Sequence, residues 1–160
     1  MIEDHQRAKM LAEYFKVADY VQAYDSQFLT IKAWGVSASA FALGIGFSRD
    51  VVEKGYQIEV FVVALALAIS FWLTETRFKL LQQGHIYRYS LLEKALQDDS
   101  YITSPAILES FGANRRLDDA RRRWRSVAFW PHVMFPHVIF VSISLILVLV
   151  AIFRSLALTR

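Results

Sequence analysis

Six arginines gather between residues 113 and 130, interleaved with apolar residues that would share one face of a helix. A basic amphipathic helix directly before an apolar segment is typical of a helix that lies on a membrane leaflet among anionic headgroups. We therefore predict lipid-headgroup binding by Arg115, Arg116, Arg121, Arg122, Arg123 and Arg125. The alternatives are a basic flank that only sets topology and a nucleic-acid site, which the lipid-facing aromatic residue of this helix argues against.

Two Pro-His dipeptides, Pro131-His132 and Pro136-His137, follow the arginines. Histidines five residues apart lie about 140° apart on a helix, so they do not converge on one metal ion. We expect side chains at the membrane interface, with a pH-sensitive role as the alternative. The chain has no cysteine, no glycine-rich phosphate loop and no recognisable catalytic set, so we expect no enzyme, no cofactor and no metal.

Three apolar segments separate the charged stretches and predict three membrane-crossing helices, at residues 28–47, 56–74 and 133–153. A helix of about 20 residues rises roughly 30 Å, which matches the hydrocarbon core of a bilayer. Lys32 lies about one turn inside the first segment, from where its amine can reach the interface. No ionisable residue lies deep in the segments, which argues against a proton relay or a secondary transporter.

Helical patterns also fill the polar regions, so we predict an all-α integral membrane protein. Residues 1–27 form a cytosolic amphipathic helix, 48–55 a short outer loop, 75–130 a cytosolic helical region with the juxtamembrane amphipathic helix, and 154–160 an outer tail. The second span should continue as one helix from about Ile58 to Asp98, because no proline interrupts it. Its apolar stripe and that of the N-terminal helix are expected to pack together, within one chain or between neighbours.

Basic residues predict the orientation of these helices. The N-terminal stretch with Lys32 and the region from Glu75 to Trp130 hold fourteen of the 18 lysines and arginines, against four in the 48–55 loop and the C-terminal tail. The basic side of a membrane protein is cytosolic. The N-terminus is therefore expected in the cytosol and the C-terminus outside.

Small residues recur every three or four positions in the first apolar segment, and such residues let helices approach closely in a bilayer. The cytosolic helices carry larger apolar residues at the same spacing. We predict helix–helix contact, inside one chain or between copies of a homo-oligomer, at Gly35, Ser39, Ala42, Gly46, Phe78, Leu81, Tyr89 and Leu92.

The predicted elements follow one another as a cytosolic helix, a span, and a second span that runs on into the cytosol. The residues that carry this order are Tyr14–Phe47 and Ile69–Leu96, notably FWLTETRFKLLQQGHIYRYSLLEKAL. This order resembles that of the small bacterial membrane effectors called SLATT proteins. The resemblance implies a multi-pass protein of the bacterial inner membrane and a pore-forming role in anti-phage defence.

Two functions stay open from the sequence. One is a non-enzymatic scaffold or accessory subunit, which assembles through its cytosolic helices and binds a cytosolic or membrane protein partner. The other is a homo-oligomeric pore or channel. A hydrophilic stripe along the first span would favour the pore, and an exposed apolar patch on the cytosolic helices would favour the scaffold.

Overall fold

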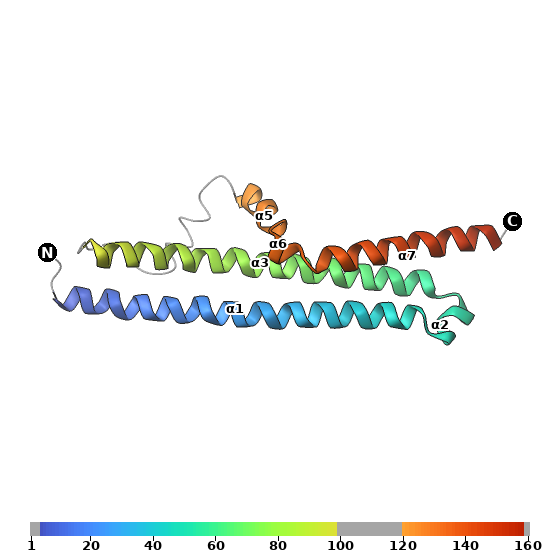
Figure 1. Ribbon diagram of the computed structural model, residues 1–160, viewed down its shortest axis with the longest axis horizontal. Helices are drawn as coiled ribbons and strands as arrows, with labels where there is room; N and C mark the ends of the chain where they lie inside the picture. Colours follow the sequence, from blue (N-terminus) through green and yellow to red (C-terminus); the bar gives the residue numbers. More distant parts are fainter. Residues whose placement is uncertain (1–3, 99–119, 159–160) are drawn as a thin grey trace. The chain divides into compact units, whose positions relative to one another are not determined.

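The described part of the chain is all-helical. A computed structural model describes residues 4–98 and 120–158, with only the backbone for residues 120–123 and 158. Helices make up 93% of these residues, and none of them lies in a strand. The helices, labelled in Figure 1, are α1 (Asp4–Gly46), α2 (Arg49–Lys54), α3 (Gln57–Gln97), α5 (Ala120–Ala128), α6 (Pro131–Met134) and α7 (His137–Leu158).

Helix α1 runs without a break from the polar N-terminal stretch through the first apolar segment. Helix α3 runs without a break from the second apolar segment into the polar stretch that follows it. Neither helix contains a proline, so no backbone hydrogen bond is lost along its length. The predicted loop between them, residues 48–55, contains the short helix α2 (Figure 1). Gly55 ends α2 in the left-handed conformation, with φ of 74°, which a residue with a side chain adopts only with strain.

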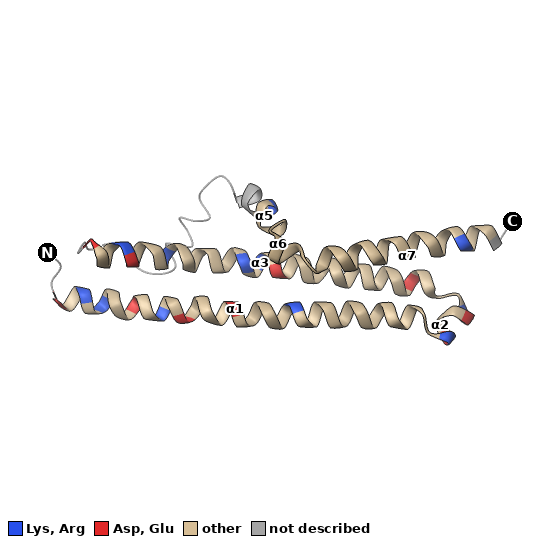
Figure 2. Ribbon diagram, viewed as in Figure 1, with Lys and Arg blue, Asp and Glu red and all other residues tan. Residues whose placement is uncertain are grey.

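Three helices, α1, α3 and α7, are long and apolar enough to cross a membrane. Helix α7 is the clearest case, because only 11% of its most apolar stretch of 18 residues is buried inside the structure. Figure 2 shows charge on α7 only toward its C-terminal end, where the sequence has Arg154. Outward-facing isoleucines, leucines and valines over such a length are what lipid requires and water disfavours. The chain is therefore all-α, and its three apolar helices indicate a multi-pass membrane protein.

The chain divides into two compact units. The first takes in Met1–Phe28 and Arg77–Val127, and we call it the paired-helix unit. The second takes in Leu29–Thr76 and Ala128–Arg160, and we call it the span unit.

In the paired-helix unit, the N-terminal part of α1 packs antiparallel to the C-terminal part of α3. Met10, Val17, Leu92 and Ala95 form its buried apolar core. Spacings of three and four residues along both helices bring these side chains to one seam, as in an antiparallel coiled coil. The two apolar stripes predicted from the sequence thus meet within one chain.

The span unit has a separate apolar core, made of Ala42, Leu43, Phe61, Ala64 and Val148 from α1, α3 and α7. Small residues allow this close packing. A Cβ atom added at Gly46 would lie 2.2 Å from a ring carbon of Phe61, which is closer than any real contact. The ring of Phe61 therefore occupies the space that glycine leaves open.

Candidate functional site

An ionic cluster inside the span unit is the chemically most distinctive feature of the structure. The Glu75 carboxylate on α3 is its centre. One oxygen, Oε1, lies 3.0 Å from the Lys32 Nζ atom on α1, and the other, Oε2, lies 2.8 Å from the His137 Nε2 atom on α7. One carboxylate therefore joins all three of the long apolar helices.

Burial distinguishes these contacts from surface ion pairs. The side chains of Glu75 and His137 are each 2% exposed, and that of Lys32 is 28% exposed. A buried carboxylate is tolerated only when opposite charge and hydrogen bonds compensate for its lost hydration. The Lys32 amine also donates a hydrogen bond to the His132 carbonyl oxygen of α6, at 2.5 Å. Short helix α6 is thereby connected to the same cluster.

The surrounding sequence positions the three side chains. Gly35 lies one turn after Lys32, and a Cβ there would be 3.0 Å from Phe71 and 3.3 Å from the His137 ring. Its missing side chain lets α3 and α7 approach α1 at this level. The Trp72 indole donates a hydrogen bond to the Ala128 carbonyl oxygen at 2.9 Å, which ties the end of α5 to α3.

The arrangement is a carboxylate with a donor at each oxygen. Both oxygens of Glu75 are already engaged by donors, so neither is available as a base or a nucleophile. Among the residues that the structure describes, no three His, Asp or Glu side chains gather as a metal site would require. The cluster can hold the three long helices together.

Sequence reasoning missed this cluster. Lys32 was expected to reach the membrane interface, and its amine instead contacts Glu75. His137 was expected as an interfacial side chain, and it is buried. A signal was present, since each of the three apolar segments has an ionisable residue near the end assigned to the cytosol. Ionisable groups at one depth in neighbouring spans are expected to pair, because lipid offers no alternative partner.

The predicted small residues all lie inside the span unit. Gly35, Ser39, Ala42 and Gly46 are buried. Of the larger predicted contact residues, Leu92 is fully buried in the paired-helix unit, and the Phe78 and Tyr89 rings pack against Tyr24 and Tyr14. Leu81 is exposed instead. The structure thus brings most of the predicted contact residues together within one chain.

Polar pairs lie along the seam of the paired-helix unit. Arg88 donates two hydrogen bonds to the Glu13 carboxylate, at 2.9 and 3.0 Å. The Gln82 amide donates to the Asp25 carboxylate at 2.7 Å. Buried polar contacts in a coiled coil fix the register of its helices, because a shifted register would leave these groups unpaired.

Two seam residues have displaced pKa values. A hydrogen bond between the Tyr14 and Tyr89 hydroxyl groups raises the pKa of Tyr14 to about 12, with burial as the second cause. The His85 ring packs against Tyr20 and Tyr24, and this burial lowers the pKa of His85 below its ordinary value. Neutral side chains are favoured at both positions in the folded state.

The predicted headgroup-binding arginines are only partly within the described residues. Arg115 and Arg116 lie outside them. The backbone of Arg121, Arg122 and Arg123 belongs to α5, and the side chain of Arg125 on the same helix is exposed. An exposed arginine on this helix is available to a headgroup.

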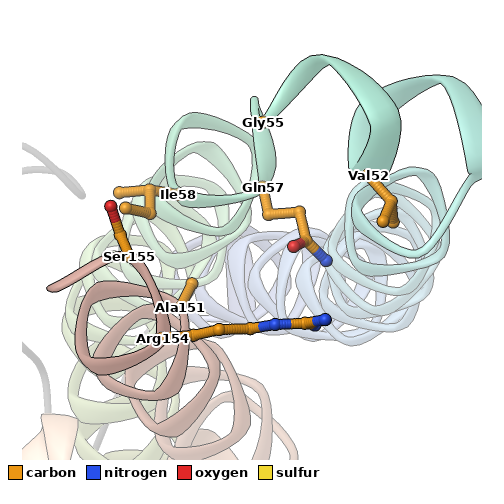
Figure 3. A pocket seen from close by; sticks show the side chains of 7 residues that line it. All are labelled: Val52, Gly55, Gln57, Ile58, Ala151, Arg154 and Ser155. Carbon is orange, nitrogen blue, oxygen red and sulfur yellow. The ribbon is translucent and has the colours of Figure 1, made fainter. Parts of the chain in front are cut away.

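A shallow pocket of about 230 Å³ lies in the span unit, where α2 leads into α3 (Figure 3). Its walls are Val52, Gly55, Gln57, Ile58, Ala151, Arg154 and Ser155. Gln57 donates a long hydrogen bond to the Gly46 carbonyl oxygen, at 3.4 Å. The pocket combines one exposed guanidinium with a mainly apolar wall.

Comparison of the chain with protein-family models, with curated proteins and with solved structures found no match.

Proposed function

We propose that this chain is a non-enzymatic membrane scaffold or accessory subunit, which assembles through its paired-helix unit. The observation that carries the proposal is an apolar stripe on α1 that the unit leaves uncovered. We call it the outer stripe, and its residues are Ala8, Leu11, Ala12 and Phe15, all exposed. Leu11 is 44% exposed and Phe15 is 59% exposed.

The outer stripe lies on a different face of α1 from the seam. Seam residues such as Met10 and Val17 point toward α3, whereas Leu11 and Phe15 lie about 100° or more away from each of them around the helix. Spacings of three and four residues keep the stripe on one face through two turns. A helix with two apolar faces needs a partner on each, and α3 covers only one of them.

The polar groups of the span unit support a scaffold over a polar-lined pore. Lys32 and His137 are both paired with Glu75 inside the unit. The outward face of the apolar part of α1 carries large apolar side chains, including Leu29, Trp34 and Phe41. Copies that associated through this face would enclose an apolar lining, with no hydrophilic stripe for ions to follow.

The second candidate is a homo-oligomeric pore, as the resemblance to SLATT effectors implies. One observation favours it. Helix α3 continues from the second apolar segment to Gln97 without a break, and this continuous helix is the feature that carries the resemblance. An apolar constriction that gates by dewetting would be the conduction path in that case.

The proposed setting is the bacterial inner membrane, with the paired-helix unit and the N-terminus in the cytosol and the C-terminus outside. The excess of lysine and arginine on the proposed cytosolic side supports this orientation. Anionic lipid headgroups would bind the arginines of α5 and of the segment before it.

We propose a second copy of the chain as the first partner for the outer stripe. Copies inserted in one membrane with the same orientation present their stripes in parallel. The stripe alternates small and large residues, so Leu11 or Phe15 of one copy can fit beside an alanine of the other. Association of this kind would give a homo-oligomer.

The test is the double substitution Leu11→Asp/Phe15→Asp in the full chain, reconstituted in lipid nanodiscs. Charged residues in an apolar contact cost free energy that the oligomer cannot recover, so we expect the wild type as an oligomer and the variant as a monomer in native mass spectrometry. Tyr87→Asp is the matched control, because Tyr87 is an exposed aromatic residue on the other helix of the same unit.

An oligomer that survives the double substitution would overturn the role of the outer stripe. A wild type that is monomeric would overturn self-association. A closed ring of about five or more copies that conducts in planar bilayers would replace the scaffold with the pore.

A further inference from the structure

We propose that the pocket between the beginning of α3 and the end of α7 binds the phosphate group of an anionic phospholipid, with the Arg154 guanidinium as its donor. The proposal concerns the span unit alone and does not depend on the scaffold function. It follows from the place of the pocket along the helices, from the chemistry of its lining and from its size.

The pocket lies at one common end of the three long apolar helices. Gln57 and Ile58, which line it, are the first two residues of α3, and Arg154 lies in the last two turns of α7. Helix α1 ends at Gly46, whose carbonyl oxygen accepts the hydrogen bond from Gln57. These helices are long and apolar enough to cross a membrane, so their common end is expected at the level of the headgroups of one leaflet.

The pocket is also the open end of the apolar core of the span unit. Ala151 packs against that core, and the next turn of α7 brings Arg154 and Ser155 to the pocket. Ile58 of α3 and Val52 of α2 complete an apolar wall. A cation beside an apolar wall suits a lipid, whose phosphate meets the charge while its glycerol and upper acyl carbons meet the wall. A water-soluble anion would gain nothing from the wall.

The charge of the pocket selects the kind of headgroup. Among the described residues that line it, Arg154 is the only charged one. Figure 3 shows its side chain extended across the pocket, with the guanidinium on the side of Val52 and the Gln57 amide. A guanidinium binds phosphate through parallel N–H donors. None of these lining residues is acidic, so none would receive the ammonium of a zwitterionic headgroup, and an anionic phospholipid such as phosphatidylglycerol is favoured.

The size of the pocket determines which part of the lipid enters it. Its 230 Å³ correspond to the space of roughly eight water molecules in the liquid. A phosphate group with part of its glycerol fits such a space, and the acyl chains stay outside in the bilayer. The Gln57 amide is held at the pocket by its bond to Gly46, and its oxygen can accept a hydrogen bond from a headgroup hydroxyl.

The test measures lipid binding beside the pocket, with the full chain in bilayer vesicles. The chain has no cysteine, so Ser48→Cys gives a single site for a fluorophore. Ser48 is exposed, makes no side-chain cap, and lies one turn of α2 from Val52, whose N–H bonds to its carbonyl oxygen. Phosphatidylglycerol with a nitroxide high on one acyl chain quenches the fluorophore. Mixing it in increasing proportion with phosphatidylcholine gives the local preference for the anionic lipid.

We expect the protein with the native pocket to prefer phosphatidylglycerol. Arg154→Gln should lower this preference about fivefold, which is what one arginine contributes near an anionic surface. Val52→Trp fills the pocket and keeps every charge, so it should lower the preference as well. Lys54→Gln is the matched control, because it removes one positive charge from an exposed residue of α2 that does not line the pocket, and it should leave most of the preference. The three positions are exposed, so the apolar core does not depend on them.

Four outcomes would overturn the site. A preference unchanged in Arg154→Gln would remove the guanidinium from it. Equal losses in Arg154→Gln and Lys54→Gln would assign the effect to surface charge in general, and an unchanged preference in Val52→Trp would show that the pocket plays no part. If excess inorganic phosphate abolishes the preference and chloride at the same ionic strength does not, the pocket takes a water-soluble phosphate and not a lipid.

Discussion

His132 and His137 each follow a proline, yet one imidazole is exposed and the other is buried against Glu75. Sequence context does not separate them, because the local motif is the same. Their elements do, since His132 lies in the short helix α6 and His137 is the first residue of α7. A pair of histidines in such a repeat should therefore be treated as two different residues.

His85 gives a prediction at the level of one residue. Burial lowers its pKa below 6.5, so its neutral form is favoured in the folded state and the cation in the unfolded state. The stability contributed by this neutral ring is complete above pH 6.5 and decreases as the pH falls below it. The protection factors of amide hydrogen exchange in the paired-helix unit, which compare the measured rates with the intrinsic rates at the same pH, should accordingly fall on acidification from pH 8 to pH 5.

The control is His85→Gln, in which the acid-induced loss of protection should disappear. Protection factors that fall equally in both proteins would contradict the assignment to His85.

Contacts between elements depend on glycine in the span unit. A Cβ at Gly46 would lie 2.2 Å from the ring of Phe61, which is itself 2% exposed. A Cβ at Gly44 meets nothing within 4 Å. Two glycines on one helix, two residues apart, therefore have opposite tolerance for a side chain.

Gly46→Ala should destabilise the protein by about 1–3 kcal/mol, as overpacking of a tight core does. Gly44→Ala should be neutral or stabilising by up to about 1 kcal/mol, because alanine favours the helix and meets no neighbour. Unfolding of both variants in detergent by a denaturant series measures the difference. Equal effects of the two substitutions would show that α1 and α3 do not approach as described.

Most of the helical architecture could be predicted from the sequence, for a physical reason. Apolar segments of span length and stripes with helical spacing are local features, so the long helix α3 and the pairing of its stripe with that of α1 follow from them. Helix α2 was missed, because its six residues RDVVEK carry no span or stripe signal. The cluster of Lys32, Glu75 and His137 was missed because it depends on how three distant segments are rotated about their axes, which spacing within one segment does not fix.

At the scale of the whole molecule, the arginines before α7 are predicted to hold the chain against an anionic leaflet. Replacing Arg121, Arg122, Arg123 and Arg125 by glutamine removes four positive charges, each contributing about 1 kcal/mol near an anionic surface. We expect the isolated 113–130 peptide with these changes to bind anionic vesicles far more weakly than the original peptide. Vesicles without anionic lipid are the control, and unchanged binding to the anionic ones would contradict the prediction.

The close approach at Gly46 also has a consequence for how this sequence can diverge. Because the Phe61 ring fills the space beside Gly46, a larger residue at either position is excluded while the other stays as it is. Related chains should therefore vary at the two positions together, with a side chain gained at 46 accompanied by a smaller residue at 61. Gly44, which faces open space, should change independently of any partner. An alignment of homologues would thus record the contact between α1 and α3 as a correlated pair beside a freely varying glycine.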